Sequence, residues 1–310
     1  MAHILPKASS LPRLGTDGTA LPPYVTTEEV LAHPRFPLAR NHYMRVMVDS
    51  HHADPAIRHL MHEMARNVLF NIILGQAARS RPDDPETWPS VGKLRDSFIP
   101  FGLVSPRSFD QMLARMKVIG MIELVPAPGD GRRRLVMPTP RMIQEDLAWL
   151  ADHMAPLAVL FPERDDYRPA LEHDRAHQMA QRIVSTQNYA WARDILSPED
   201  PVRALLLRQD AAKIVFIYLL AALESGGSRA SVSFEMAAVR LSTSRTHVRN
   251  LLSDLQTHGL VVLHGRGGTD VEITPQLWTV VDRFLAEAMS GHDLVWQVAR
   301  LMVAQTAIAA

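Results

Sequence analysis

Apolar side chains recur every three or four residues over most of the chain, a spacing typical of amphipathic helices. Two short apolar runs on either side of a polar turn interrupt this spacing and predict a pair of β-strands. The predicted order is helix, short helix, longer helix, strand, turn, strand and helix. The corresponding ranges are 55–76, 90–97, 105–120, 121–125, 126–134, 135–137 and 139–160.

Polar, proline and glycine residues mark the boundaries of the predicted helices. Ser105 can accept a hydrogen bond from the first turn of the longer helix, and Pro106 suits the first helical position because no N–H is needed there. Gly120 follows this helix, where a left-handed cap favours glycine. Thr139 and Pro140 begin the last helix in the same way as Ser105 and Pro106.

The same pattern occurs a second time, so that residues 40–155 resemble residues 190–290. Three blocks align without gaps, and the offset between the copies falls from 146 to 139 to 135 residues along the chain. The blocks are 54–74 with 200–220, 105–120 with 244–259, and 139–154 with 274–289. Because the length differences fall between the blocks, where loops are predicted, the chain contains a duplicated domain and not a solenoid repeat.

The duplication divides the chain into five predicted segments. Residues 1–39 are rich in Pro, Gly, Ser and Thr and are predicted to form a mobile tail. Residues 40–160 and 198–290 are the two copies. Residues 161–197 are predicted to be a helical linker, and residues 291–310 a C-terminal helix that packs on the core or mediates self-association.

Composition narrows the classes of protein to consider. A chain of 310 residues is long enough for two domains with their own cores, and the lack of cysteine excludes disulfides and thiolate sites. No apolar run approaches the length of a membrane span, and the first 38 residues lack the pattern of a secretory signal. Lys plus Arg and Asp plus Glu both number 33, which counts against extensive non-specific nucleic-acid binding but permits a local basic face. We therefore expect a cytoplasmic protein with no membrane partner.

The order of predicted elements is that of a winged helix-turn-helix, and each copy resembles a MarR-type winged-helix DNA-binding domain. The resemblance rests on 104–140 in the first copy and on 243–275 in the second. It implies a mainly α fold with small β-wings, of the α+β class, in which tandem winged helix-turn-helix domains form a pseudo-dimer within one chain. In that family two chains dimerise through terminal helices, and the resemblance leaves open whether this chain also forms a homodimer through its terminal helices.

The wings of the two copies differ. In the MarR family the wing commonly carries an Asp and an Arg at its tip, and the first copy has Asp130 and Arg132 there. The second copy has Arg266 followed by two glycines, with Asp270 later. This departure from the family pattern leaves open whether the second winged helix binds DNA.

Outward residues of the two longer helices fit DNA recognition without reference to the family. Arg can form two hydrogen bonds with guanine, and Asn or Gln can do so with adenine. A helix N-terminus can bind a phosphate, and arginines in a turn can reach phosphates or a narrow minor groove. The candidate DNA-binding residues are Ser105, Arg107, Ser108, Gln111, Arg115, Arg132, Arg133 and Arg134, and in the second copy Ser244, Arg245, Thr246, His247, Arg249, Asn250 and Arg266. Such residues also suit a solvated face, but the matching Arg and amide at both helix starts favour DNA.

Other chemistry has weaker support in the sequence. His173 and His177 are spaced by one helical turn, but no third ligand and no HExxH motif accompany them, so we predict no metal site. A small apolar effector pocket near Trp149 or Trp278 rests on family analogy alone. No phosphate-binding glycine loop or catalytic constellation occurs, so we expect neither an enzyme nor a cofactor.

These observations predict a sequence-specific transcriptional regulator that binds double-stranded DNA through two non-identical recognition helices in one chain. Unequal helices predict an imperfect, non-palindromic site, unless the chain itself also dimerises. One alternative is a plasmid replication initiator, which also uses tandem winged helices but is typically strongly basic. The other is a protein-interaction scaffold that kept the fold and lost DNA binding, which the neutral charge and the second wing favour.

Overall fold

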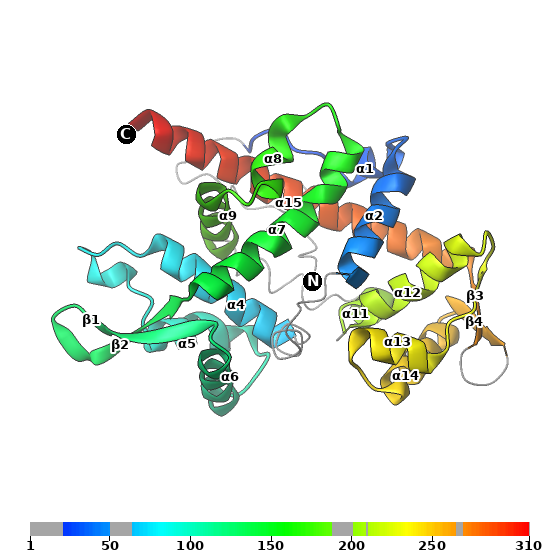
Figure 1. The fold of residues 1–310 in the computed structure, drawn as a ribbon, viewed down its shortest axis with the longest axis horizontal. Helices are drawn as coiled ribbons and strands as arrows, with labels where there is room; N and C mark the ends of the chain where they lie inside the picture. The colour runs from blue at the N-terminus through cyan, green and yellow to red at the C-terminus, as the bar shows by residue number, and fades with distance from the viewer. Residues whose placement is uncertain (1–20, 50–63, 188–200, 209, 265–268, 310) are drawn as a thin grey trace.

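The computed structural model describes residues 21–49, 64–187, 201–208, 210–264 and 269–309. The fold is mainly helical with two small antiparallel sheets, which confirms the expected α+β class. Two lobes lie side by side along the longest axis, and a layer of longer helices joins them on one side (Figure 1).

Lobe 1, residues 64–138, contains one long and two shorter helices followed by a hairpin. Its elements are α4 (Met64–Arg79), η2 (Pro85–Thr87), α5 (Val91–Phe98), η3 (Ile99–Phe101), α6 (Pro106–Val118), β1 (Ile122–Ala127) and β2 (Asp130–Pro138). The two strands pair antiparallel, with a shift of register between Pro126 and Ala127. An isolated bridge between Ser90 and Leu135 attaches the segment before α5 to the hairpin.

Lobe 2, residues 201–273, repeats this order. Its elements are α11 (Pro201–Leu206), α12 (Ala211–Glu224), β3 (Arg229–Ala230), α13 (Phe234–Leu241), α14 (Arg245–Thr257), β4 (Val261–His264) and β5 (Asp270–Ile273). The strands form a sheet in the order β3-β5-β4. The short strand β3 lies before α13 and pairs with β5. In lobe 1 the bridge between Ser90 and Leu135 has the corresponding position before α5.

A long helix follows each hairpin and crosses to the other side of the molecule. α7 (Pro140–Leu160) leaves lobe 1, and α15 (Pro275–Ala309) leaves lobe 2 and ends on the side of lobe 1 (Figure 1). Thr139 caps α7 by accepting a hydrogen bond from the Met142 N–H. The remaining helices are α1 (Thr27–Ala32), α2 (Phe36–Asp49), η4 (Asp165–Tyr167), α8 (Arg168–Leu171) and α9 (Arg175–Gln187).

The helices that precede each lobe pack on the opposite lobe. α2 comes before lobe 1 in the chain but packs on α12 of lobe 2 and on α7. α9 comes before lobe 2 but packs on α4 of lobe 1 and on α15. In the same way α1 packs on α15, and α8 packs on α7. The two halves of the chain are therefore intertwined by a reciprocal exchange of helices.

This exchange corrects the predicted segments. Residues 1–20 lie outside the described residues, but the rest of the predicted tail is ordered, because Thr26 and Glu29 form a capping box and Val30 is buried. The segment 161–197 is helical as predicted where it is described, up to residue 187, but its helices pack into the core and do not merely link the copies. The C-terminal helix is not a separate element, because α15 is continuous from Pro275 to Ala309.

Two large hydrophobic cores and two smaller clusters occur among the described residues. The larger one joins lobe 2 to α2, α7 and α15, and lobe 1 has a core of its own around Phe98, Phe109 and Met116. Between lobe 1 and α9 the contact is tight, because a Cβ placed on Gly75 would collide with the side chain of Thr186. Close backbone approach of this kind is a common reason for glycine within a helix.

Candidate nucleic-acid interface

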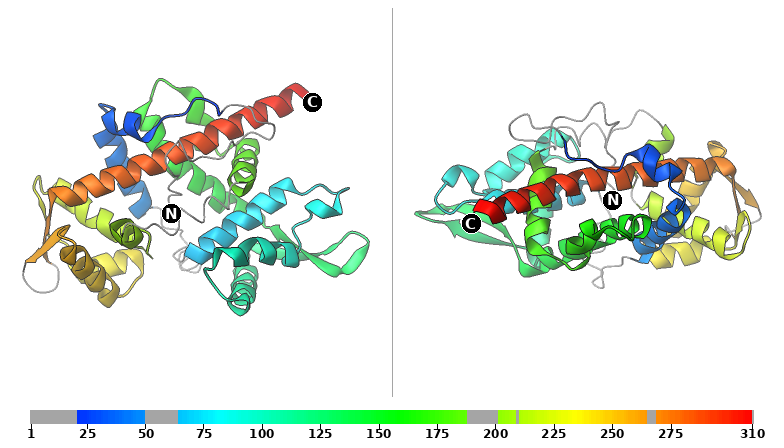
Figure 2. Two further views of the ribbon diagram at one scale, coloured as in Figure 1. Left: turned by 180° about the vertical axis from the view of Figure 1, so that it is seen from behind. Right: turned by 90° about the horizontal axis from the view of Figure 1, so that it is seen from above.

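Helices α6 and α14 lie at the ends of the two lobes farthest from α7 and α15, both on the same side of the molecule (Figure 1). The hairpin of lobe 1 and the sheet of lobe 2 lie at the two outer flanks. The view from behind shows the same arrangement (Figure 2). One face of the chain therefore presents two equivalent helices, each with a β-hairpin beside it.

The sequence folds into these two helices through matching local signals. Ser105 Oγ accepts a hydrogen bond from the Ser108 N–H at 3.2 Å, and Ser244 Oγ accepts one from the His247 N–H at 3.0 Å. The apolar stripe of each helix is buried in its lobe: Phe109, Met112, Leu113 and Met116 in α6, and Val248, Leu251, Leu252 and Leu255 in α14. Burial of these stripes fixes which residues face the solvent.

The candidate residues on the two helices are accessible, as predicted. Ser108 and His247 are half-buried, and the others are exposed: Ser105, Arg107, Gln111, Arg115, Ser244, Arg245, Thr246, Arg249 and Asn250. Ser105 and Ser244 use their hydroxyl oxygens to cap their own helices. The side chains of Arg107, Gln111, Arg115, Arg249 and Asn250 are exposed on these two helices.

Lobe 1 leaves most of its basic side chains without an acidic partner. Arg107, Arg115 and Lys117 of α6 are exposed and form no ion pair with any described residue. Arg95 of α5 is paired with Asp110 at 2.5 Å, but both side chains are largely exposed, and exposed pairs of this kind are weak. The exposed face of α6 is therefore basic, with Lys117 as an additional cation that the sequence analysis did not select.

The three arginines of the lobe 1 hairpin do not act as one group. Arg132 and Arg134 are exposed on one face of β2, whereas Arg133 lies on the other face, with its guanidinium 5.9 Å from the centre of the Trp88 ring. Alternation of side chains along a strand is the physical reason. Arg133 therefore lies apart from Arg132 and Arg134, against Trp88, and contact of any of the three with DNA stays a prediction.

Trp88 itself was not selected from the sequence. It is buried under the hairpin with Ala127 and Leu135, and its Nε1–H donates a hydrogen bond to the Arg81 carbonyl at 2.9 Å. This small cluster supports the hairpin of lobe 1. In the sequence, Trp88 stands at the end of a Pro- and Asp-rich loop, and a loop of that composition is expected at the surface.

Most of the described arginines of lobe 2 have an acidic partner, although these pairs are exposed and therefore weak. Four ion pairs account for this: Arg208 with Asp254 at 2.8 Å, Arg229 with Asp270 at 3.0 Å, Arg240 with Asp49 at 2.6 Å, and Arg245 with Glu235 at 3.5 Å. Arg249 forms no ion pair within the part of the chain that is described. The two lobes thus share their backbone arrangement but differ in how many of their basic side chains have an acidic partner. The last predicted residue, Arg266, lies outside the described residues.

The structure also bears on the other candidate sites. His173 lies before α9 with a positive φ of 59°, so it does not share a helix face with His177 as the spacing suggested. Within the described ranges, no cluster of three potential metal ligands occurs, and no helix has the length and apolar character needed to cross a bilayer. Trp149 packs beneath Arg182 at 4.5 Å and Trp278 beneath Arg40 at 4.6 Å. The histidines at 51, 52, 59 and 62 lie outside the described residues.

Comparison with known proteins finds no match among protein-family models, curated proteins or solved structures. Any function assigned to the chain therefore depends on its own residues and geometry.

Proposed function

We propose that this protein is a sequence-specific regulator of transcription that binds double-stranded DNA. In this proposal each lobe is a winged helix-turn-helix of the MarR type, and α6 and α14 are its recognition helices. The observation that carries the proposal is the pair of matching Ser-capped, exposed helices on one side of a single chain, each beside a hairpin on the outer flank. A single chain then contacts both half-sites of the DNA, as the two chains of a symmetric dimer do.

The shape of the major groove supports this assignment. An α-helix fits into the groove and reads base edges with the side chains of its first turns. In α6 these turns carry Arg107 and Gln111, and in α14 they carry Arg245 and Asn250. Each helix therefore offers one group suited to guanine and one suited to adenine.

The difference in charge between the lobes supports an asymmetric target. Arg107, Arg115 and Arg134 are free to contact phosphates or bases, whereas Arg245 of lobe 2 already faces Glu235. Lobe 1 then supplies most of the electrostatic affinity, and lobe 2 adds a weaker contact about one helical turn away along the DNA. The target is a strong half-site next to a weak one.

DNA fragments selected by the full-length protein from its own genome provide the test. Binding of the best fragment is measured by fluorescence anisotropy at salt concentrations from about 50 to 200 mM, over which phosphate contacts weaken. Arg107→Ala is expected to reduce affinity by about 1–3 kcal/mol, and Arg134→Ala to make the salt dependence shallower by about one ion.

Arg168→Ala is the matched control, because Arg168 is an exposed arginine on α8, away from both reading helices. It should leave DNA binding unchanged. If no fragment is enriched at low salt, or if Arg107→Ala and Arg168→Ala bind equally well, the assignment of α6 is incorrect.

A second candidate is a protein-interaction role for lobe 2. Met236 and Val239 lie one turn apart on α13 and are 62% and 69% exposed, which is unusual for large apolar side chains at neighbouring positions. Lys93 and Asp96 take the corresponding positions on α5 of lobe 1. If Met236→Lys leaves DNA affinity unchanged but abolishes activity in the cell, lobe 2 contacts a protein. Sedimentation of the purified protein tests the alternative in which the chain also forms a homodimer through its terminal helices.

A further inference from the structure

In each lobe an ion pair joins the short helix to the reading helix (α6 or α14), but the charges are reversed between the two lobes. In lobe 1 the cation is Arg95 on α5 and the carboxylate is Asp110 on α6, with 2.5 Å between nitrogen and oxygen. In lobe 2 the carboxylate is Glu235 on α13 and the cation is Arg245, the first residue of α14, with Nη1 3.5 Å from Oε2. The reading helix of lobe 2 therefore supplies the arginine of its pair, whereas the reading helix of lobe 1 supplies the acid.

Lobe 1 has no side chain at the position that Glu235 takes in lobe 2. Ser90 caps α5 in the same way as Ser233 caps α13. Two residues after the cap, lobe 1 has Gly92 and lobe 2 has Glu235. A Cβ placed on Gly92 would meet no atom within 4 Å, so the packing of lobe 1 leaves room for a side chain there. The acid beside the start of the reading helix therefore distinguishes lobe 2 and does not follow from the shared packing.

Glu235 contacts one nitrogen of the Arg245 guanidinium and leaves the other two open. The contact is made by Nη1, while Nε and Nη2 form no hydrogen bond with any described residue. Nε and Nη2 lie along one edge of the planar guanidinium, and such an edge can bind the O6 and N7 atoms of guanine. Because the Arg245 side chain is 71% exposed, this edge can be reached by a partner. The pair with Glu235 therefore leaves a guanine-binding edge of Arg245 available.

A side chain that holds Arg245 before DNA arrives lowers the entropic cost of recognition. Arginine has several rotatable bonds, and ordering them is part of the cost of each contact that it makes. An exposed ion pair shifts an equilibrium by at most about fivefold, so Glu235 favours one orientation of Arg245 without locking it. The pair therefore has a modest effect on affinity for DNA that offers a guanine to Arg245.

On DNA that lacks this guanine, the charge of Glu235 acts in the opposite direction. A carboxylate beside the start of α14 repels the phosphates of any duplex, whatever its base sequence. The carboxylate also gives Arg245 a contact of the same exposed kind as a phosphate would, so a phosphate alone gains little by drawing Arg245 away. Glu235 therefore weakens non-specific binding and supports binding to guanine.

We propose that Glu235 is a positioning residue of lobe 2, which holds Arg245 for a guanine and thereby sets the specificity of this lobe. Lobe 1 then supplies most of the affinity, and lobe 2 supplies discrimination between sequences. The inference rests on the proposed function, because it concerns the same interface with DNA. An acid in the first turn of a helix also stabilises that helix through its dipole, a role that Glu235 fits as well. The two roles differ in what the loss of the charge does to DNA binding.

The Kd of Glu235→Gln for two duplexes separates these roles. The duplexes are the best fragment selected by the full-length protein and an unrelated fragment of equal length, both titrated by fluorescence anisotropy at about 100 mM salt. For the selected fragment the Kd should rise by about threefold to fivefold, because Arg245 loses its support. For the unrelated fragment the Kd should fall by about twofold to fivefold, because a negative charge is removed. Shifts of both Kd values in the same direction, or no shift in either, overturn the proposal.

A double-variant cycle tests whether Glu235 acts through Arg245. Arg245→Ala alone should raise the Kd for the selected fragment by about fivefold or more. In the Arg245→Ala background, Glu235→Gln should no longer raise that Kd, because the side chain that Glu235 holds is absent. A rise of the same size in both backgrounds overturns the positioning role and indicates direct contact of Glu235 with DNA.

Asp254→Asn is the matched control for charge. Asp254 is an exposed acid near the end of α14, paired with Arg208 at 2.8 Å, so the substitution removes a negative charge from the same lobe without touching Arg245. It should not raise the Kd for the selected fragment, and a rise equal to that of Glu235→Gln overturns the proposal. If the unaltered protein binds no selected fragment, the proposed function fails together with this inference. Normal binding with an unchanged ratio of the two Kd values in Glu235→Gln overturns the inference alone.

Discussion

The ion pair between Arg182 of α9 and Asp146 of α7 is the sharpest test of the intertwined fold. The two side chains are 2% and 0% exposed. Arg182 Nε donates to Asp146 at 3.0 Å, its Nη2 donates to the other Asp146 oxygen, and its Nη1 donates to Asn71 of α4. Arg182 lies on α9, which precedes lobe 2 in the chain. Its side chain therefore connects α4 of lobe 1 to the long helix α7. We expect Arg182→Met to destabilise the protein strongly.

The magnitude follows from what the substitution leaves behind. Methionine keeps much of the apolar stem but removes both hydrogen bonds from Arg182 to the buried Asp146, which keeps its hydrogen bond from Gln178. A hydrogen bond to a charged group contributes about 1.5–3 kcal/mol, so two of them amount to about 3–6 kcal/mol. Removing one partner of a buried ion pair typically costs about 3–5 kcal/mol, which agrees with that sum. The melting temperature should fall by at least about 6 °C.

Urea and thermal unfolding followed by circular dichroism measure this loss. Arg182→Leu combined with Asp146→Leu should recover most of it, since replacing both members of a buried pair by apolar groups is often neutral. Arg168→Met is the matched control, because its pair with Glu172 is exposed, and it should change stability little. A loss below about 1 kcal/mol for Arg182→Met, or a double variant no more stable than the single one, would refute the exchange of helices as described.

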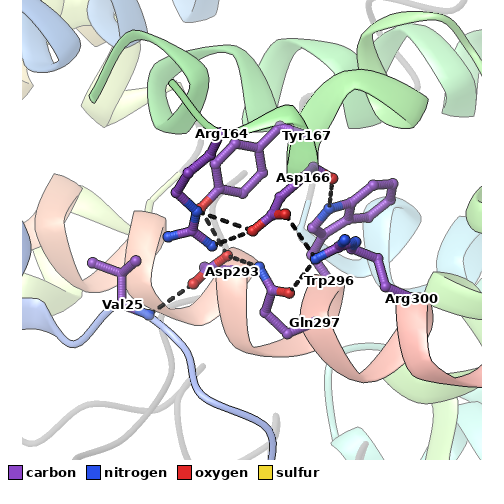
Figure 3. Close-up of polar contacts among 8 residues, drawn as sticks. All are labelled: Val25, Arg164, Asp166, Tyr167, Asp293, Trp296, Gln297 and Arg300. Atoms are coloured by element: carbon purple, nitrogen blue, oxygen red, sulfur yellow. Dashed lines mark hydrogen bonds and ion pairs between the residues drawn. The ribbon is translucent and has the colours of Figure 1, made fainter. Parts of the chain in front are cut away.

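Three further expectations follow from other contacts. Gly75→Ala should cost about 1–3 kcal/mol because its Cβ collides with Thr186, and Thr186→Ala in the same chain should recover much of that loss in thermal unfolding. Trp88→Ala should lower the free energy of unfolding by about 3–5 kcal/mol and weaken DNA binding, because the lobe 1 hairpin loses its support. A folded Trp88→Ala variant that binds DNA as tightly as the unaltered protein would contradict this. Figure 3 shows Asp293 of α15, which accepts hydrogen bonds from Tyr167 and Gln297. Burial raises the pKa of the Asp293 carboxyl above its usual range, so the protonated form favours the fold, and this contribution is lost as the pH rises through the raised pKa. Over that range the unfolding free energy should fall for the unaltered protein relative to Asp293→Asn, and parallel pH profiles would contradict the expectation.

The boundaries of the reading helices could be predicted because their signals are local. Ser105 and Pro106 were expected to begin the helix and Gly120 to follow it, and α6 runs from Pro106 to Val118. The position of Arg133 on the opposite face from Arg132 and Arg134 could also have been derived from the alternation of a strand. The three arginines were grouped because they are adjacent in sequence.

The exchange of helices was missed because its signal is spread over long distances. Leu31-x-His33-x-Arg35 returns as Leu171-x-His173-x-Arg175, an offset of 140 residues, so the duplication already included the segments assigned to a tail and a linker. The Pro- and Gly-rich composition of residues 1–39 suggested a mobile tail, so this match was not used. Similarly, the pairing of Arg245 with Glu235 depends on the angle between α13 and α14, which no local pattern determines.

The central claim is that one chain presents two unequal reading helices to one face of DNA. Hydroxyl-radical footprinting on the best selected fragment tests this directly, with the number of bound chains measured by mass photometry. The account predicts one chain per fragment and two protected segments about 10–10.5 base pairs apart, with the stronger protection lost in Arg107→Ala. A single protected segment, two chains per site, or equal protection of both segments would contradict it.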